Sequence, residues 1–126
     1  MKDLIILTDK PITYDSINQI IKEEFKSYPL LNDDSHLIYM KKSCSGFELE
    51  LSPNDKLNDP ECMMDDTVDR CPNKEAFLTN LNYTSTAIAK RIIRLIIHNY
   101  GNMWIQSDEA DDWFGTAQEF LDNYNN

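Results

Sequence analysis

The stretch from Thr84 to Gly101 reads TSTAIAKRIIRLIIHNYG and is the most regular part of the chain. At 3.6 residues per turn its basic side chains fall on one stripe, and apolar residues fill the remaining sides. Ser85 offers a hydroxyl N-cap, and Gly101 suits the position after the last turn. A helix over 85–100 is therefore expected at the centre of the core. The basic stripe consists of Lys90, Arg91, Arg94 and His98. We expect it either to face solvent or to pair with an acidic segment.

Shorter periodic segments lie on both sides of this helix. Apolar runs or alternating patterns predict strands at 4–7, 37–40, 47–51, 77–83 and 103–107, and amphipathic runs predict helices at 13–27 and 116–124. Strands grouped between helices are typical of the α+β class. We expect a single domain over 1–126, with a mostly antiparallel sheet of about five strands. Two main helices on one face and a short C-terminal helix complete the order β-α-β-β-β-α-β-α.

The segment 53–75 has no stable period. It contains three prolines, and its acidic residues outnumber its basic ones seven to three. The composition predicts a long surface loop. Since long loops in compact domains are usually functional or disordered, this one is a second candidate contact region.

Charge excludes two kinds of partner. The 126 residues include 22 acidic and 12 basic side chains, for a formal net charge of -10. A bare phosphate backbone or an anionic membrane surface repels such a chain, so neither nucleic acid nor a membrane is an expected partner. With 41% hydrophobic residues, the chain has enough apolar side chains for a real core.

The sequence gives no sign of cofactor chemistry. No Gly-rich phosphate loop, Ca²⁺ loop or Cys/His metal spacing is present, so no cofactor or metal is expected. Three cysteines cannot all pair, and no apolar run approaches the ~20 residues of a membrane span. The expected location is the cytoplasm. Catalysis is not expected either, since the best nucleophile and base, Cys44 and His36, form a weak pair.

The negative charge is most concentrated near the C-terminus. No Lys or Arg occurs in 101–126, and the residues Ser107 to Gly115 read SDEADDWFG. One or two of these carboxylates suffice to cap the last helix, but four in five positions exceed that need. Together with the adjacent aromatics and the acids of the long loop, these carboxylates predict a contact surface for a basic protein. The predicted surface consists of Asp108, Glu109, Asp111, Asp112, Trp113, Phe114, Asp65, Asp66 and Asp69.

A small, acidic α+β domain with this carboxylate and aromatic patch resembles the immunity proteins of bacterial toxin systems, including contact-dependent growth inhibition. The resemblance is one of type across the whole chain and involves no shared motif. It implies binding and blocking of a cognate toxin, often a basic nuclease. Two alternatives use the same features. A DNA-mimic inhibitor presents similar carboxylates, and an adaptor subunit exposes similar aromatics.

Overall fold

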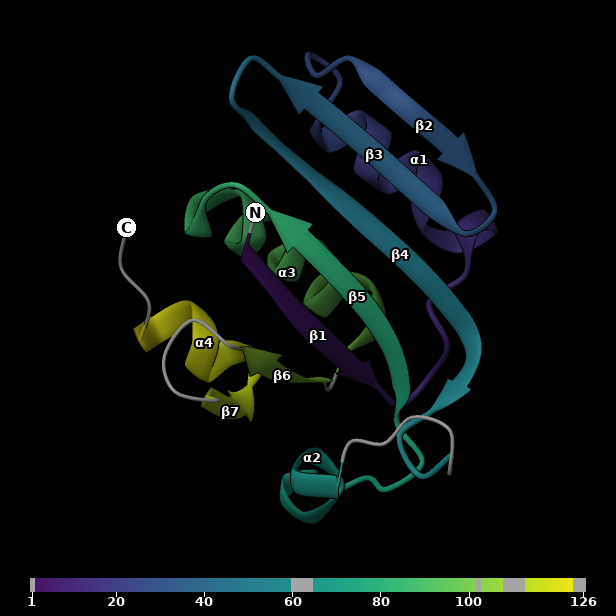
Figure 1. Cartoon of the computed structure of the whole chain (residues 1–126), viewed down its shortest axis with the longest axis vertical. Helices are drawn as coiled ribbons and strands as arrows, with labels where there is room; N and C mark the ends of the chain where they lie inside the picture. The colour runs from purple at the N-terminus through teal and green to yellow at the C-terminus, as the bar shows by residue number, and fades with distance from the viewer. Residues whose placement is uncertain (1, 60–64, 102, 108–112, 124–126) are drawn as a thin grey trace.

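In the computed structural model, a single antiparallel sheet organises the chain (Figure 1). The structure describes residues 2–59, 65–101, 103–107 and 113–123. Its strands are β1 (Lys2–Thr8), β2 (Leu30–Asp34), β3 (Leu37–Lys42), β4 (Ser45–Lys56), β5 (Phe77–Tyr83), β6 (Met103–Ser107) and β7 (Trp113–Thr116). Its helices are α1 (Tyr14–Glu24), α2 (Asp65–Arg70), α3 (Thr86–Tyr100) and α4 (Ala117–Asn123). The seven strands lie in the order β2-β3-β4-β5-β1-β6-β7, and all paired neighbours are antiparallel.

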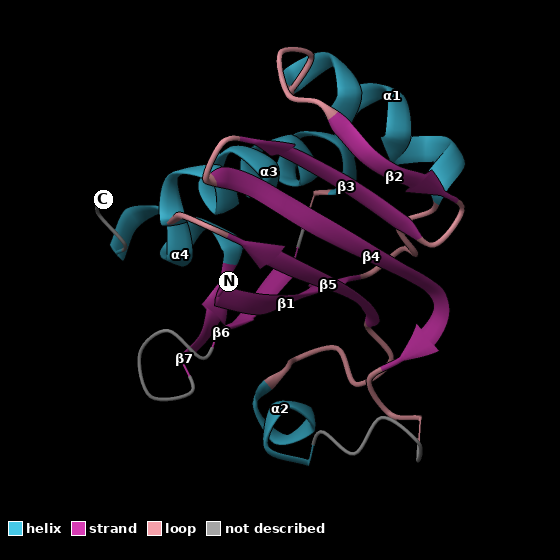
Figure 2. Cartoon of the chain, turned by 45° about the horizontal axis from the view of Figure 1, so that its top comes forward, coloured by secondary structure: helices cyan, strands magenta, loops and turns pink. Residues whose placement is uncertain are grey.

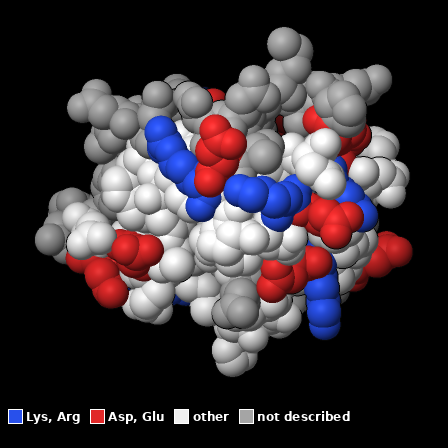
Figure 3. All heavy atoms as spheres, turned by 90° about the horizontal axis from the view of Figure 1, so that it is seen from below, with Lys and Arg blue, Asp and Glu red and all other residues white. Residues whose placement is uncertain are grey.

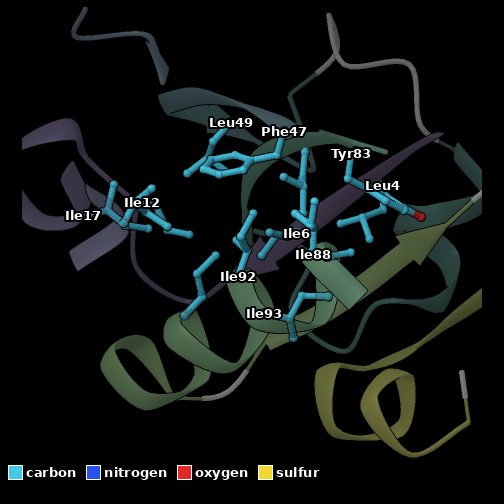
Figure 4. Packing of buried hydrophobic residues seen from close by; sticks show 14 of the residues in the cluster. Leu4, Ile6, Ile12, Ile17, Phe47, Leu49, Tyr83, Ile88, Ile92 and Ile93 are labelled. Carbon is cyan, nitrogen blue, oxygen red and sulfur yellow. The ribbon is translucent and has the colours of Figure 1, made fainter. Parts of the chain in front are cut away.

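The main core lies between this sheet and three helices. α1, α3 and α4 lie on the same side of the sheet, whereas α2 lies beyond its other side (Figures 1 and 2). Leu4 and Ile6 of β1 and Ile92 of α3 are buried in this core (Figure 4). Each such side chain contributes about 1.5–3 kcal/mol when it leaves water. The core therefore fixes which face of the sheet is covered.

The apolar helix of the sequence forms as expected. Ser85 is the N-cap of α3, and its side chain accepts a hydrogen bond from the backbone N–H of Ile88. Gly101 ends the helix with a φ of 78°, a left-handed conformation that glycine adopts without strain, and its N–H donates to the Ile97 carbonyl. Five of the buried residues of α3 are apolar, which confirms its central place.

The α+β class is confirmed, but the number and order of strands were wrong. The sheet has seven strands instead of about five. The order β-α-β-β-β-α-β-α omitted β2 and β7. All residues of β2 are exposed, so this edge strand shows no alternation between apolar and polar side chains. β7 has four residues, directly after the acidic run. In addition, α1 ends at Glu24, not near residue 27.

The segment 53–75 is more ordered than a surface loop. β4 continues to Lys56, and α2 forms within the segment. A second, smaller core on the α2 side of the sheet holds it in place. Its buried members are Leu7, Leu57, Cys71 and Ala76. The expectation of an irregular loop was therefore wrong for these parts, because tertiary burial orders a stretch that has no periodic pattern.

Two polar contacts attach the helices to their neighbours. The Lys22 Nζ of α1 lies 2.6 Å from Asp33 Oδ2 of β2, and the Tyr14 hydroxyl donates to the same carboxylate. The hydrogen bond from Lys22 holds the pKa of Asp33 below its usual range, and the same bond raises the pKa of Lys22. Arg91 of α3 lies 4.3 Å from the centre of the Phe25 ring and donates to the Glu24 carbonyl.

Candidate protein-binding surface

The side of the sheet opposite α1, α3 and α4 carries polar side chains along its central strands. Successive residues of a strand point to opposite faces, so the neighbours of buried core residues point away from the core. In Figure 1 no helix lies in front of β3, β4, β5 and the upper part of β1. We call this surface the open face. It consists of Asp3, Ile5, Tyr39, Glu48, Glu50, Asn80 and Asn82.

Strand register places these side chains in rows across the sheet. Glu48 of β4 pairs with Asn82 of β5, which in turn pairs with Asp3 of β1. In the next row Glu50 pairs with Asn80. Glu48 and Asp3 are therefore roughly 10 Å apart across two strand spacings, and Glu48 and Glu50 roughly 7 Å apart along one strand. Three carboxylates are thus fixed on a rigid sheet with amide side chains between them.

These carboxylates are free to receive a cation. Among the described residues, Asp3, Glu48 and Glu50 take part in no ion pair. Asp3 and Glu50 are exposed, and Glu48 is half-buried. Lys41 lies on the same face one row beyond Glu48, also without an ion pair in the described part of the chain. A fixed array of unpaired negative charge attracts a positively charged surface over a Debye length of about 8–10 Å.

The fold brings α2 next to the strand that leads into the acidic run. The Thr67 Oγ1 of α2 donates a hydrogen bond of 3.1 Å to Gln106 Oε1 of β6, two residues before Asp108. Asp69 on α2 is exposed and makes no ion pair with another described residue. α2, which carries Asp69, therefore lies beside a strand that is far from it in sequence.

Several predicted contact residues are not described. Asp108, Glu109, Asp111 and Asp112 lie outside the described residues, as do the side chains of Asp65 and Asp66 within α2. The residues that flank the C-terminal acids, Ser107 and Trp113, are paired across β6 and β7. That pairing places these two flanking residues on the last two strands at one edge of the sheet.

The two predicted aromatic anchors are partly used inside the fold. Trp113 packs against Phe120 of α4 with ring centroids 5.8 Å apart, and its indole lies against Gly115. Phe114 points to the other side of β7 and packs against the second core. Both rings are half-buried. Only part of each ring is left for a partner.

Charge is mixed at the end of the molecule where α2 lies, at the bottom of Figure 1. Lys and Arg side chains lie among Asp and Glu side chains on the end of the molecule that Figure 3 shows. The acids visible there do not form a continuous negative patch. The positions of the unpaired carboxylates therefore matter more than the net charge of -10.

The best nucleophile and base of the sequence, Cys44 and His36, are far apart. His36 precedes β3 and Cys44 follows it, so the six-residue strand separates them by roughly 20 Å. Proton transfer between side chains needs hydrogen-bond reach, about 3 Å. Cys71 is buried, and burial raises the pKa of its thiol. Among the described residues, no group of three or more His, Cys, Asp or Glu side chains gathers as a metal site.

Sequence reasoning missed the open face, although part of the signal was present. Glu48 and Glu50 alternate with Phe47, Leu49 and Leu51. This alternation predicts a strand with one solvent-exposed face and one buried face. Asp3 carries no such signal, because it reaches the same face only through the pairing of β1 with β5. Long-range strand order therefore creates the array.

Comparison with known proteins identifies no relative. No family model matches the chain, and no curated protein or solved structure matches it. Within the described part of the chain, every helix falls short of the length and apolar character needed to cross a membrane.

Proposed function

We propose that this protein is a cytoplasmic binding protein of the immunity type, which neutralises a cognate, basic toxin domain by covering its cationic surface. The observation that carries the proposal is the array of Asp3, Glu48 and Glu50 on the open face. These carboxylates have no ion pair among the described residues and are held by a rigid sheet. A toxin that grips phosphates must present Lys and Arg, which such an array attracts.

The acidic run and α2 extend the proposed contact. α2 bonds to β6, so exposed Asp69 lies near this strand, and α2 is on the same side of the sheet as the open face. Asp108, Glu109, Asp111 and Asp112 are included in the proposed contact on the strength of the sequence alone. Electrostatic attraction from the open face accelerates encounter, and half-exposed Phe114, on the same side of the sheet, supplies apolar contact.

Binding kinetics test the proposal. The partner is first isolated by co-purification from the native cell, and its inhibition by the purified protein is then measured. We expect the variant Glu48→Lys/Glu50→Lys to associate at least tenfold more slowly at low salt, because charge complementarity chiefly sets the association rate. Asp108→Lys/Asp111→Lys/Asp112→Lys is expected to act in the same direction.

A matched control separates location from net charge. Asp15→Lys/Glu23→Lys produces the same change in charge on exposed positions of α1, on the other side of the sheet. It is expected to slow association far less. Equal slowing in both double variants, or no slowing in either, contradicts the assignment of the open face as the contact.

The same measurements distinguish the alternatives. A DNA-mimic inhibitor uses the same carboxylates, but duplex DNA competes with it and it binds many DNA-binding proteins. An adaptor subunit binds through apolar area, so its association depends little on salt. Toxin neutralisation instead requires loss of the toxin's activity on binding, at a single tight site.

A further inference from the structure

The side of the molecule away from the open face contains a groove lined by an arginine and a histidine. It lies between α3 and α4, which are neighbours in both ribbon views (Figures 1 and 2). The hollow has a volume of about 350 Å³, within the range of small binding pockets. Its lining consists of Arg94, Ile97, His98, Gln118 and Leu121.

Arg94 and His98 of the groove belong to a row of basic residues along α3. Lys90, Arg94 and His98 are spaced four residues apart, so they share one stripe of the helix over roughly 12 Å. Arg91 does not belong to it, because Arg91 pairs with Glu24 of α1. The basic stripe of the sequence therefore separates into one structural arginine and a row of three other basic groups.

The row has no acidic partner within the described part of the chain. Neither Lys90, Arg94 nor His98 forms an ion pair there, although acidic residues outnumber basic ones 22 to 12. Lys90 is only 7% exposed. Arg94 and His98 are exposed at the groove. A carboxylate that met them would gain charge-assisted hydrogen bonds, the strong class in proteins.

We infer that this groove binds an acidic peptide segment of a second protein partner. The Arg94 guanidinium suits a bidentate carboxylate, and His98 and Gln118 supply further donors. Half-buried Ile97 and Leu121 contact an apolar side chain between the acids. Arg94 and His98 lie about 6 Å apart along the helix, which matches two residues of extended chain.

The inference goes beyond the proposed function. The groove takes acids, whereas the open face takes a basic surface, and the two lie on opposite sides of the sheet. Both can therefore be occupied at once. Gln118 donates one amide hydrogen to Asp122 at 3.1 Å, so this carboxylate lies beside the groove and repels an incoming acid.

A peptide titration followed by NMR tests the inference. The probe is a short peptide of alternating glutamate and leucine, and the readout is amide shifts in the ¹⁵N-labelled full chain. Saturable shifts confined to α3 and α4 are expected. Arg94→Gln/His98→Gln is expected to weaken binding at least tenfold, and Asp122→Asn to strengthen it. Circular dichroism checks that both variants keep the fold.

Two controls decide the outcome. Lys26→Gln/Lys42→Gln removes two exposed basic side chains that do not line the groove and is expected to leave the affinity within about twofold, since solvent and salt screen charges that do not contact the peptide. A peptide with glutamine in place of glutamate is expected not to bind. Absence of saturable shifts overturns the inference, as does equal weakening in both double variants or equal binding of the glutamine peptide.

Discussion

On one side of the sheet Leu4 and Ile6 are buried in the core with α3, whereas Asp3 and Glu50, on the other side of the same sheet, are exposed to solvent. Both sets come from strands in which inward and outward residues alternate. The covered side has its contacts inside the molecule, where apolar burial supplies the stability. The open face has polar groups that the fold leaves unpaired. Substitutions should therefore affect stability on one side and binding on the other.

The largest effect is expected from the covered side. Ile92→Ala removes a fully buried side chain from the centre of the core, so it should destabilise the protein by about 2–5 kcal/mol. Ile5→Ala, at a half-buried position on the other side of the sheet, should cost roughly half as much. Urea denaturation measures both. Equal costs would show that the two sides are packed alike.

A smaller loss is expected where β7 meets the core. A Cβ at Gly115 would lie 2.7 Å from Cη2 and Cζ2 of Trp113, so Gly115→Ala must displace the indole. Overpacking of this kind costs about 1–3 kcal/mol. In a Trp104→Phe background, Trp113 fluorescence should change because the ring leaves Phe120. Unchanged fluorescence relative to that background would contradict the packing of Trp113.

The ion pair between Lys22 of α1 and Asp33 of β2 should contribute less to stability, and its contribution should depend on pH. Asp33→Asn is expected to cost about 0.2–1 kcal/mol at neutral pH, as for other surface ion pairs. Because the pKa of folded Asp33 is lowered, its contribution is complete above the usual aspartate pKa of about 3.9 and is lost as pH falls through the folded value.

Denaturation of wild type and variant between neutral and acidic pH checks this sign. The gap in stability should close as the pH becomes acidic. Lys22→Met in wild type and in the Asp33→Asn background completes a double-mutant cycle. A gap that widens on acidification would show that Lys22 does not stabilise the Asp33 carboxylate.

The smallest effect is expected on the open face. Asp3→Asn/Glu50→Gln should change stability by less than about 0.5 kcal/mol, because neither carboxylate has an ion pair among the described residues. Thermal denaturation at low and moderate salt measures the change. A loss well above that value would mean that these acids support the fold, which would weaken their proposed role in binding.

Local patterns predicted several elements from the sequence. The apolar stretch with Ser85 and Gly101 at its ends gave α3, and alternation around Glu48 and Glu50 gave the central part of β4. These signals are local, since periodicity and capping act within a few residues. The order of the predicted strands and helices also indicated the α+β class, and the composition showed the surplus of acidic residues.

Other features depend on contacts between distant parts of the chain. β2 exposes all of its residues, including Leu31 at 56%, and so has no pattern to detect. α2 lacks a periodic signal and is held by burial of Cys71 and by the bond from Thr67 to Gln106. Likewise, only the aromatic packing on α4 shows that Trp113 is partly used inside the fold.

The sequence by itself determined the main helix, α3, and the density of acidic side chains. Tertiary structure decided which acids stand together, since Asp3 meets Glu48 only because β5 lies between β1 and β4. It also decided which basic residue is structural, through the contact of Arg91 with α1. Strand order and helix docking join residues far apart in the chain, and the free energy of such contacts comes from the whole core, which no local pattern encodes.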